Sequence, residues 1–398
     1  MTTESEARVG SNAIVNESRT RAVTLGRSLA AGPHQEAARA ILAPFESVAY
    51  VYASLDAMAG DDDRELRSRR AREELLKGGA SEQATSALTT RLTVAARPAA
   101  TLAAFVCADG ALLHEQVMSG ADLADDTGVR SPAPVLPLLA WGQDRPPFLL
   151  VVTDRAGADL TASPGAGQRE QTFCVVGPDD EIERKHGPGG WSQPSYQHRV
   201  EDSWRHNAAR VAQEVTAHAA AVGAQVLVLS GDVRAVQLLS DRLTDDPAVL
   251  VRHISGSRAA DGSQASRASR LEAVLREAAD TQTARLLDAL QEHLEPGGLA
   301  VEGVEDTVEA LANGRVATLL VQAMPGDPRT AWFGAGPTEV YPDHDAAVLS
   351  GVPVRQGHLV DVATRSALLA GAHVRVIPPG TPGEPAGGIG AICRYRTP

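Results

Sequence analysis

A glycine-rich segment from Gly187 to Arg199 has the residue types and spacing most typical of a binding element in this sequence. It reads Gly-Pro-Gly-Gly-Trp-Ser-Gln-Pro-Ser-Tyr-Gln-His-Arg. Because glycine and proline at this density disfavour both helix and sheet, we expect a projecting loop with Trp191 exposed at its tip. An exposed indole can stack on an unpaired base, so the loop is a candidate RNA-contacting element.

A polar stripe is predicted on the helix that follows this loop. Arg199, Ser203, His206 and Arg210 stand at i, i+4, i+7 and i+11, which places them on one helix face. Residues 184–210 contain five Lys/Arg and two acidic residues, a local charge of +3 in a chain of net charge -13. A solvated helix face and a plain connecting loop are the alternatives, but the two features together favour an RNA-facing surface. The candidate RNA-binding residues are Gly189, Gly190, Trp191, Ser192, Gln193, Tyr196, His198, Arg199, His206 and Arg210.

A second candidate site consists of six acidic residues near three predicted strands. Clustered carboxylates bind Mg²⁺ around scissile phosphates, so a metal-dependent ribonuclease is an alternative function. We favour the simpler interpretation as turn and loop acids, because two of the six flank a turn and four crowd one loop. The residues are Asp154, Asp159, Asp179, Asp180, Glu181 and Glu183.

Other catalytic signatures do not occur in the sequence. Neither lysine is followed by Ser or Thr, so there is no Walker A loop, and there is no Gly-x-Ser-x-Gly or His-Glu-x-x-His motif. Asp343-His344-Asp345 is interpreted as a solvated turn, and Glu214 with His218 as a helix-surface pair. We therefore predict no cofactor, no metal and no catalytic residue.

The composition restricts location and partners. No apolar run is long enough for a signal-peptide core or a membrane span, so no membrane partner is expected. Cys107, Cys174 and Cys393 lie far apart, which fits a reducing cytoplasm without disulfides or zinc sites. The net charge of -13 argues against general nucleic-acid binding, DNA included, since such binding needs a positive surface. Any RNA contact must therefore be local.

The element order around the loop predicts a ribonuclease H-like central domain, residues 141–272. Three strand-like runs with short connections indicate an antiparallel meander. Apolar residues then recur at steps of three or four from Tyr196 to Val222, which predicts a long amphipathic helix ended by Gly223. The glycine- and serine-rich stretch from Ser255 to Ser266 is interpreted as a mobile connection. The predicted strands and helices are 148–153, 159–162 and 171–176, then 196–222, 225–229, 233–243 and 249–253.

Two further domains are expected, for three in total, in an α/β and α+β fold class. Residues 1–140 form a mixed α/β domain with a loose leader, in which Asp109-Gly110 signals a hairpin. Five prolines between Pro132 and Pro147 mark its boundary, at a density expected to exclude a helix. A long helix near 269–294 leads into residues 273–398, predicted to be a small α/β sandwich.

The glycine-tipped loop resembles that of the archaeo-eukaryotic class I release factors. Their central domain carries Gly-Gly-Gln-Ser-Ala-x-Arg-Phe-x-Arg-x-Arg, followed by a long helix with acids and a His-Asn pair near its start. The similar positions here are Gly189, Gly190, Ser192, Tyr196 and the stretch from Glu201 to Asn207. Trp191 stands in place of the catalytic glutamine, while Ser195 and His198 replace two arginines.

The C-terminal segments 367–378 and 387–395 look like the last domain of Pelota, so the resemblance covers about residues 141–398. The best match is to the bacterial branch of this family, which includes the ribosome hibernation factor Balon and its actinobacterial relatives. This resemblance implies a non-enzymatic, ribosome-binding protein of hibernation, stress response or stalled translation. It would occupy the A site with loop 187–195 directed to the peptidyl transferase centre. Its implied partners are ribosomal RNA and a translational GTPase, elongation factor Tu.

The replacement of glutamine decides the expected chemistry. An indole cannot position a water molecule at the peptidyl-tRNA ester as that glutamine does. We therefore expect no hydrolysis. Residual peptidyl-tRNA hydrolysis through Gln193 in a shifted loop stays open as an alternative.

Overall fold

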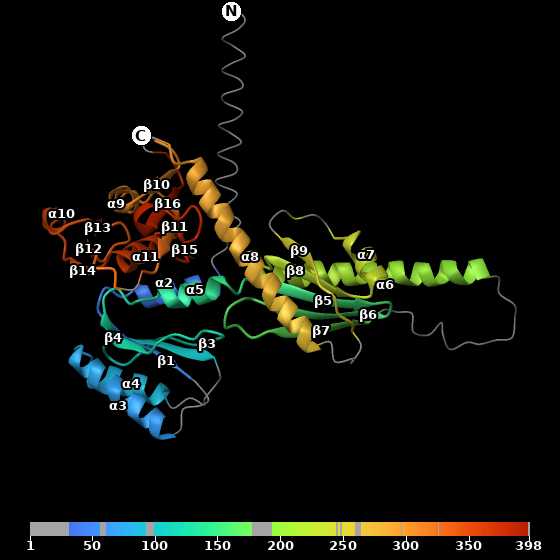
Figure 1. Cartoon of the computed structure of the whole chain (residues 1–398), viewed down its shortest axis with the longest axis horizontal. Coiled ribbons are helices and arrows are strands. Elements are labelled where there is room, and N and C mark those ends of the chain that lie inside the picture. The colour runs from blue at the N-terminus through green and yellow to red at the C-terminus, as the bar shows by residue number, and fades with distance from the viewer. Residues whose placement is uncertain are drawn as a thin grey trace, which may run out of the picture. The chain divides into compact units, whose positions relative to one another are not determined.

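The computed structural model describes most of the chain as two compact units (Figure 1). The described residues are 32–55, 61–92, 99–176, 193–243, 246, 249–258, 264–295, 297–324 and 326–396, with the side chains of 61–64 and 193–203 excepted. One unit is Asp144–Thr281, and the other combines Met1–Gln143 with Gln282–Pro398. Each unit combines helices with sheet, one sheet in the unit Asp144–Thr281 and three in the other, which confirms the α/β and α+β fold class. The division into three domains stays a prediction, because packing does not establish which segments fold independently.

The central unit contains a five-stranded sheet with the order β7-β6-β5-β8-β9. Strands β7, β6 and β5 pair antiparallel, and β8 and β9 continue parallel to β5. This arrangement confirms the predicted meander and the ribonuclease H-like element order. Its elements are β5 (Phe148–Asp154), β6 (Gly157–Ser163), β7 (Gln171–Val176), α6 (Gln193–Val222), β8 (Val226–Gly231), α7 (Val233–Ser240) and β9 (Leu250–His253).

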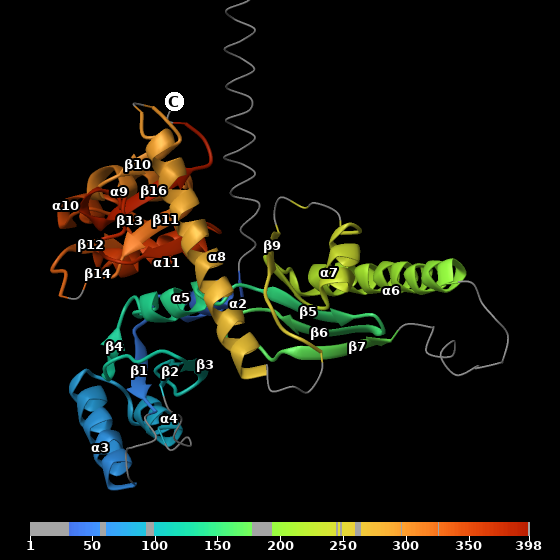
Figure 2. The same ribbon diagram turned by 45° about the vertical axis from the view of Figure 1, so that its right-hand side comes forward.

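Both faces of this sheet are covered because its strands are apolar on both sides. On β5, Leu149 and Val151 join a core with α6 and α7, while the alternate residues Leu150 and Val152 face α8 (Gln264–Glu292). Successive strand residues point to opposite faces, so a continuous apolar run serves two cores. Figure 2 shows α6 running along this sheet.

Helix α6 confirms the amphipathic helix predicted from the periodicity. Val211 and Val215 are almost fully buried against the sheet, at 2% and 1% exposed. The helix is followed by Gly223, whose φ of 61° lies in the left-handed region that favours glycine at a helix end.

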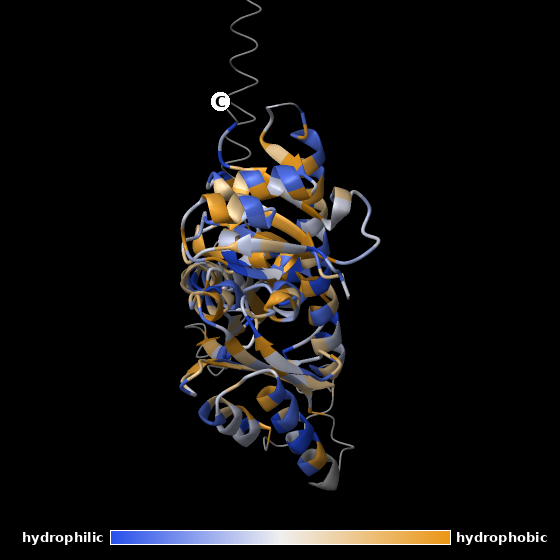
Figure 3. Cartoon of the chain, turned by 90° about the vertical axis from the view of Figure 1, so that its left-hand side faces the viewer, coloured by the Kyte–Doolittle hydropathy of each residue, from blue (hydrophilic) through white to orange (hydrophobic). Residues whose placement is uncertain are grey.

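The N-terminal part of the other unit is built on a four-stranded sheet with the order β3-β2-β1-β4. Gly110, with φ of 83°, lies in the predicted hairpin between β2 and β3. Its helices carry both hydrophilic and hydrophobic residues, as the colouring in Figure 3 shows. The elements are α2 (Pro33–Leu42), β1 (Val48–Ser54), α3 (Asp61–Lys77), α4 (Glu82–Arg91), β2 (Ala100–Val106), β3 (Leu112–Ser119), β4 (Asp126–Arg130) and α5 (Leu136–Gln143).

Helix α5 contradicts the expectation that the proline-rich stretch excludes a helix. Pro137 is the second residue of α5. The first turn of a helix has N–H groups without intrahelical partners, so a proline there costs no hydrogen bond. The helix then continues through Leu138, Leu139 and Trp141, which are buried.

The C-terminal part of the same unit contains two sheets, with the orders β10-β16-β11-β15 and β13-β12-β14. Helices and strands alternate along this part of the chain, which fits the predicted small α/β sandwich. The elements are β10 (Ala300–Glu302), α9 (Val304–Ala312), β11 (Val316–Gln322), β12 (Thr330–Phe333), β13 (Val340–Tyr341), α10 (His344–Leu349), β14 (Arg355–His358), α11 (Leu359–Leu369), β15 (His373–Ile377), η2 (Ala386–Gly388) and β16 (Ile389–Cys393).

A buried arginine joins the two sequence segments of this unit. Arg365 is 2% exposed, and its guanidinium donates to the main-chain oxygens of Leu42, Gly334 and Ala335 at 3.0–3.1 Å. Each of the three guanidinium nitrogens of this buried cation therefore has an acceptor. The hydrogen bond to Leu42 fixes α2 against residues more than 300 positions away.

Candidate functional site

The loop that carries the release-factor-like motif lies outside the described residues. Gly189, Gly190, Trp191 and Ser192 therefore stay predictions. Helix α6 begins immediately afterwards, so the backbone of Gln193, Tyr196, His198 and Arg199 forms its first turns.

Two of the candidate RNA-binding residues have described side chains. His206 and Arg210 are both exposed on α6. They lie on the helix face opposite Val211 and Val215, which are buried. The structure thus places the C-terminal half of the predicted stripe on the surface, as the helical spacing requires.

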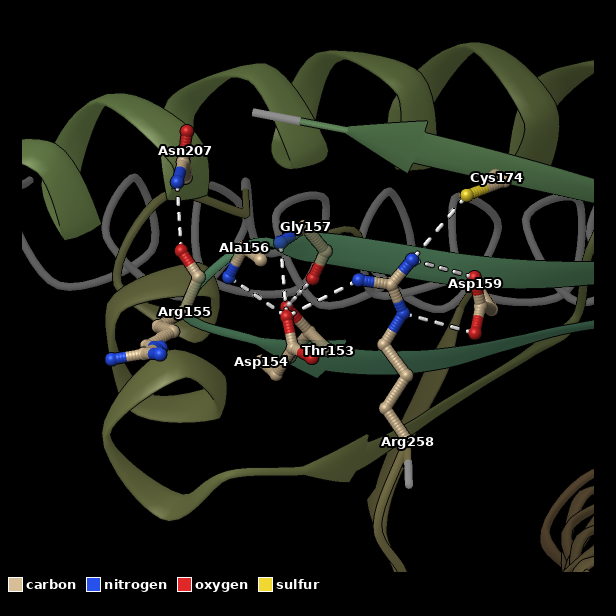
Figure 4. A network of polar contacts seen from close by, with 9 residues as sticks. All are labelled: Thr153, Asp154, Arg155, Ala156, Gly157, Asp159, Cys174, Asn207 and Arg258. Carbon is tan, nitrogen blue, oxygen red and sulfur yellow. Dashed lines mark hydrogen bonds and ion pairs between the residues drawn. The ribbon is translucent and has the colours of Figure 1, made fainter. Parts of the chain in front are cut away.

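Asn207, between these exposed residues, fixes α6 to the sheet. Its side chain is buried at 5% exposed, and Nδ2 donates to the main-chain oxygen of Arg155 at 2.7 Å. Arg155 lies in the turn that joins β5 to β6 (Figure 4). This hydrogen bond satisfies the buried Nδ2 group and attaches α6 to the turn.

The turn itself is shaped by Asp154. Its Oδ1 accepts from the main-chain N–H groups of Ala156 and Gly157 at 2.8 and 3.0 Å, as in an Asx turn. Only glycine fits at position 157, the first residue of β6, because a Cβ there would lie 1.9 Å from the main-chain oxygen of Val175.

Arg258 ties this turn to the segment that follows β9. Its guanidinium donates to both carboxylate oxygens of Asp159 at 2.9 Å, to Asp154 at 3.2 Å and to the Cys174 sulfur at 3.3 Å (Figure 4). The hydrogen bonds from Arg258 hold the pKa of Asp159 below its ordinary value, although burial opposes this shift. The pKa of Arg258 is raised by the same contact, so the pair is ionised at neutral pH.

Asp154 is confirmed as a turn acid, whereas Asp159 lies in β6 and pairs with Arg258. One oxygen of Asp154 closes the turn, and a single cation bridges both carboxylates. In the part of the chain that the structure describes, no three His, Cys, Asp or Glu side chains are grouped to hold a metal ion. Asp179, Asp180, Glu181 and Glu183 lie outside the described residues.

Of two other interpretations from the sequence, the helix-surface pair is confirmed, whereas Asp343-His344-Asp345 is the exposed start of helix α10 and not a turn. Asp343 caps α10 by accepting from the main-chain N–H of Ala346 at 2.8 Å. Glu214 and His218 pair across one turn of α6 at 3.7 Å, and the His218 ring stacks on Phe173 with centroids 3.8 Å apart.

The role of Arg258 was missed because it lies in a stretch interpreted as a mobile connection. For residues 255–258 that interpretation is wrong. Arg267 donates to the main-chain oxygen of Ser257 at 2.7 Å, and Arg270 donates to that of Ser255 at 2.9 Å. Glycine and serine predict a loop, but no local signal shows that distant arginines hold it.

The fold and the α6 site define a layered α/β domain in which helix α6 follows the Gly-Gly-Trp-Ser motif in the sequence. Residues 147–295 match the model of bacterial archaeo-eukaryotic release factor family 2. This segment is therefore similar to bacterial archaeo-eukaryotic release factors, as the loop motif predicts. Membership of the Balon-like branch stays a prediction.

Relatives cover more of the chain than this family segment. The uncharacterized protein Rv2629 of Mycobacterium tuberculosis (strain ATCC 25618 / H37Rv) is 29% identical over 268 residues, which are 66% of this chain and 69% of that protein. The uncharacterized protein MT2704 of Mycobacterium tuberculosis (strain CDC 1551 / Oshkosh) matches with the same values.

Solved structures with similarity include three translation factors. Archaeal translation termination factor aRF1 matches at 15% identity and a TM-score of 0.22, covering 87% of this chain and 92% of that one. Dom34 of S. cerevisiae matches at 10% identity and a TM-score of 0.39, and the match covers 75% of this chain and 80% of that one. A model of ribosome-bound archaeal Pelota and ABCE1 matches at 13% identity and a TM-score of 0.40. The match covers 93% of this chain and 96% of that one. Among the residues described here, no helix is long and apolar enough to cross a membrane.

Proposed function

We propose that this protein binds the ribosome and occupies the A site without hydrolysing peptidyl-tRNA. Loop 187–195 would be directed to the peptidyl transferase centre, and the exposed face of α6 would contact ribosomal RNA. Such occupancy suits a cytoplasmic factor of hibernating or stalled ribosomes. The loop would then extend to the peptidyl transferase centre as in a release factor, and the bound protein would block the A site.

The observation that carries this proposal is the exposed pair His206 and Arg210 on a helix that starts directly after the Gly-Gly-Trp-Ser motif. Their cationic and polar groups are suited to phosphate contacts, and the loop supplies an aromatic group for stacking. The hydrogen bond from Asn207 to Arg155 supports the same proposal, because a helix fixed to its sheet can present a loop in a defined direction.

The absence of hydrolysis follows from Trp191 at the glutamine position. A nuclease is the weaker proposal, because Arg258 pairs with both Asp154 and Asp159 where a metal would need free carboxylates. The sequence likeness of residues 367–395 to the end of Pelota supports a translational GTPase as second partner. We propose elongation factor Tu in this role.

Co-sedimentation with vacant bacterial ribosomes tests the proposal. The wild-type protein should pellet with ribosomes, and a variant lacking Gly189–Gln193 should bind at least about tenfold more weakly, since loop stacking contributes about 1–3 kcal/mol per base. A matched control is Arg234→Gln, which removes an exposed charge from α7 of the same unit. Equal, weak binding by wild type and deletion variant would defeat the proposal.

A further inference from the structure

A groove lies on the central unit between α6 and the C-terminal end of α7. It is an open depression of about 560 Å³. Most of its described walls are small or polar side chains, and among the described lining residues there is one cation and no carboxylate. The lining residues are Ala209, Ala212, Gln213, Thr216, Ala217 and Arg242. We call this depression the α6–α7 groove.

The polar stripe of α6 continues into this groove. His206, Arg210, Gln213 and Ala217 follow one another at steps of four, three and four residues, so they lie in one line along the helix. Gln213 and Ala217 line the groove, and Arg210 is exposed one turn before them. The candidate RNA-facing stripe is therefore the outer rim of the groove.

The opposite wall presents a second guanidinium. Arg242 is half-buried, and its Nη1 donates to the main-chain oxygen of Leu238 at 2.9 Å. This hydrogen bond orients the planar group, which carries five N–H donors in all. An arginine held in this way presents the fork of donors that suits a phosphate.

The surroundings favour an anionic occupant. The nearest acid along the helix, Glu214, pairs with His218 and does not line the groove. Three alanines on the α6 wall let a polymer backbone approach closely. Arg242 on the wall and Arg210 one turn before the groove bring two guanidinium groups near a described lining without a carboxylate, although exposed Asp241 precedes Arg242 in the sequence.

We propose that the α6–α7 groove binds a phosphate-bearing segment of ribosomal RNA, with Arg210 and Arg242 as the two phosphate-contacting residues. This inference rests on the proposed ribosome-binding function and deepens it by assigning the RNA a surface beyond the glycine-tipped loop. The bound segment would extend from the face of α6 toward the end of α7.

The test is a salt titration of binding to vacant bacterial ribosomes. Each lost phosphate contact lowers the slope of log K against log salt by about one. The double variant Arg210→Gln/Arg242→Gln should therefore lose about two from the slope and about tenfold in affinity near 0.1 M salt. A matched control, Arg169→Gln/Arg234→Gln, removes two exposed charges of the same unit that do not line the groove, and should change the slope by less than one. Unchanged thermal melting of both variants would show that each is folded.

The outcomes separate this inference from the proposed function. If wild type binds ribosomes and the two double variants behave alike, the groove is not an RNA contact and the inference fails alone. A loss of affinity without a change of slope overturns it as well, because the groove then contacts a ribosomal protein. If the wild-type protein does not bind at all, the proposed function fails first.

Discussion

The side-chain amide of Asn207 donates to the main-chain oxygen of Arg155, 52 residues earlier in the sequence. Through this contact the helix that follows the glycine-tipped loop is attached to the β5–β6 turn. The same turn is held by Asp154, which is bridged to Asp159 by Arg258. One polar network thus connects three segments of the central unit (Figure 4).

Replacing Asn207 with alanine should loosen α6. The change removes a buried donor and leaves the carbonyl of Arg155 without this partner, at a cost of about 1–3 kcal/mol. Hydrogen exchange should be faster in α6 around residues 204–210 and unchanged in β11 and β15 of the other unit. The exposed residue Gln213 provides the control, since Gln213→Ala should change stability by less than about 0.5 kcal/mol. Equal exchange in wild type and Asn207→Ala would show that the contact does not hold the helix.

Removing Arg258 should make the central unit less dependent on pH in the acid range. The pKa of Asp159 is lowered in the folded state, so the ion pair stabilises the protein above about pH 4 and this contribution is lost as pH falls through the lowered pKa. Arg258→Gln should cost about 1 kcal/mol at pH 7, a small value because Asp159 is half-exposed and solvent screens the pair.

Urea midpoints at pH 7 and pH 3 measure this effect, and the difference between wild type and Arg258→Gln should shrink at pH 3. The control is Arg252→Gln, because Arg252 pairs with Glu277 at 3.3 Å on the surface of the same unit. A difference between wild type and Arg258→Gln that grows on acidification would contradict the ion pair.

Asp361 should give the other unit the opposite pH dependence. Burial raises the pKa of Asp361 to about 7 in the folded protein. The unfolded state releases this proton near pH 4 while the folded state keeps it, so stability falls as pH rises from about 4 to 7. Asp361→Asn should therefore raise the urea midpoint relative to wild type at pH 8 and change it little at pH 4. Asp306→Asn on the exposed face of α9 is the control and should show neither change.

The sequence predicts most elements of both units because their periodicities are strong. The three strands of the meander and the helix ended by Gly223 follow from strand-like runs, turn residues and a 3.6-residue repeat. Helix α5 was not predictable from proline density, since the position of Pro137 in the first turn decides its effect. Short elements such as α10 and β13 carry too few residues for any period to emerge.

The candidate site was predictable only where one segment contains all its residues. The stripe with His206 and Arg210 follows from spacing within a single helix. The contacts of Arg258 with Asp154 and Asp159 join positions about a hundred residues apart, so they emerge only once the sheet is folded. Arg242 was missed for the same reason, because its place opposite α6 depends on the packing of α7.

Purified protein should not release peptide from peptidyl-tRNA on stalled ribosomes. Trp191 lacks the side-chain amide with which a glutamine positions water, so the rate of peptide release should equal that of ribosomes alone within error. Gln193→Ala is the matched variant, since Gln193 is the one glutamine near the tip that could act in a shifted loop. Release by wild type that Gln193→Ala abolishes would establish a hydrolase and contradict the assignment of a non-catalytic role.

Competition for the A site is the most direct test of the central claim. Binding of the protein is measured on bacterial ribosomes whose A site is either empty or filled with a cognate transfer RNA. If the protein occupies the A site, its affinity should drop by at least about tenfold on filled ribosomes, because the two ligands exclude each other. Equal affinity for empty and filled ribosomes would contradict A-site occupancy.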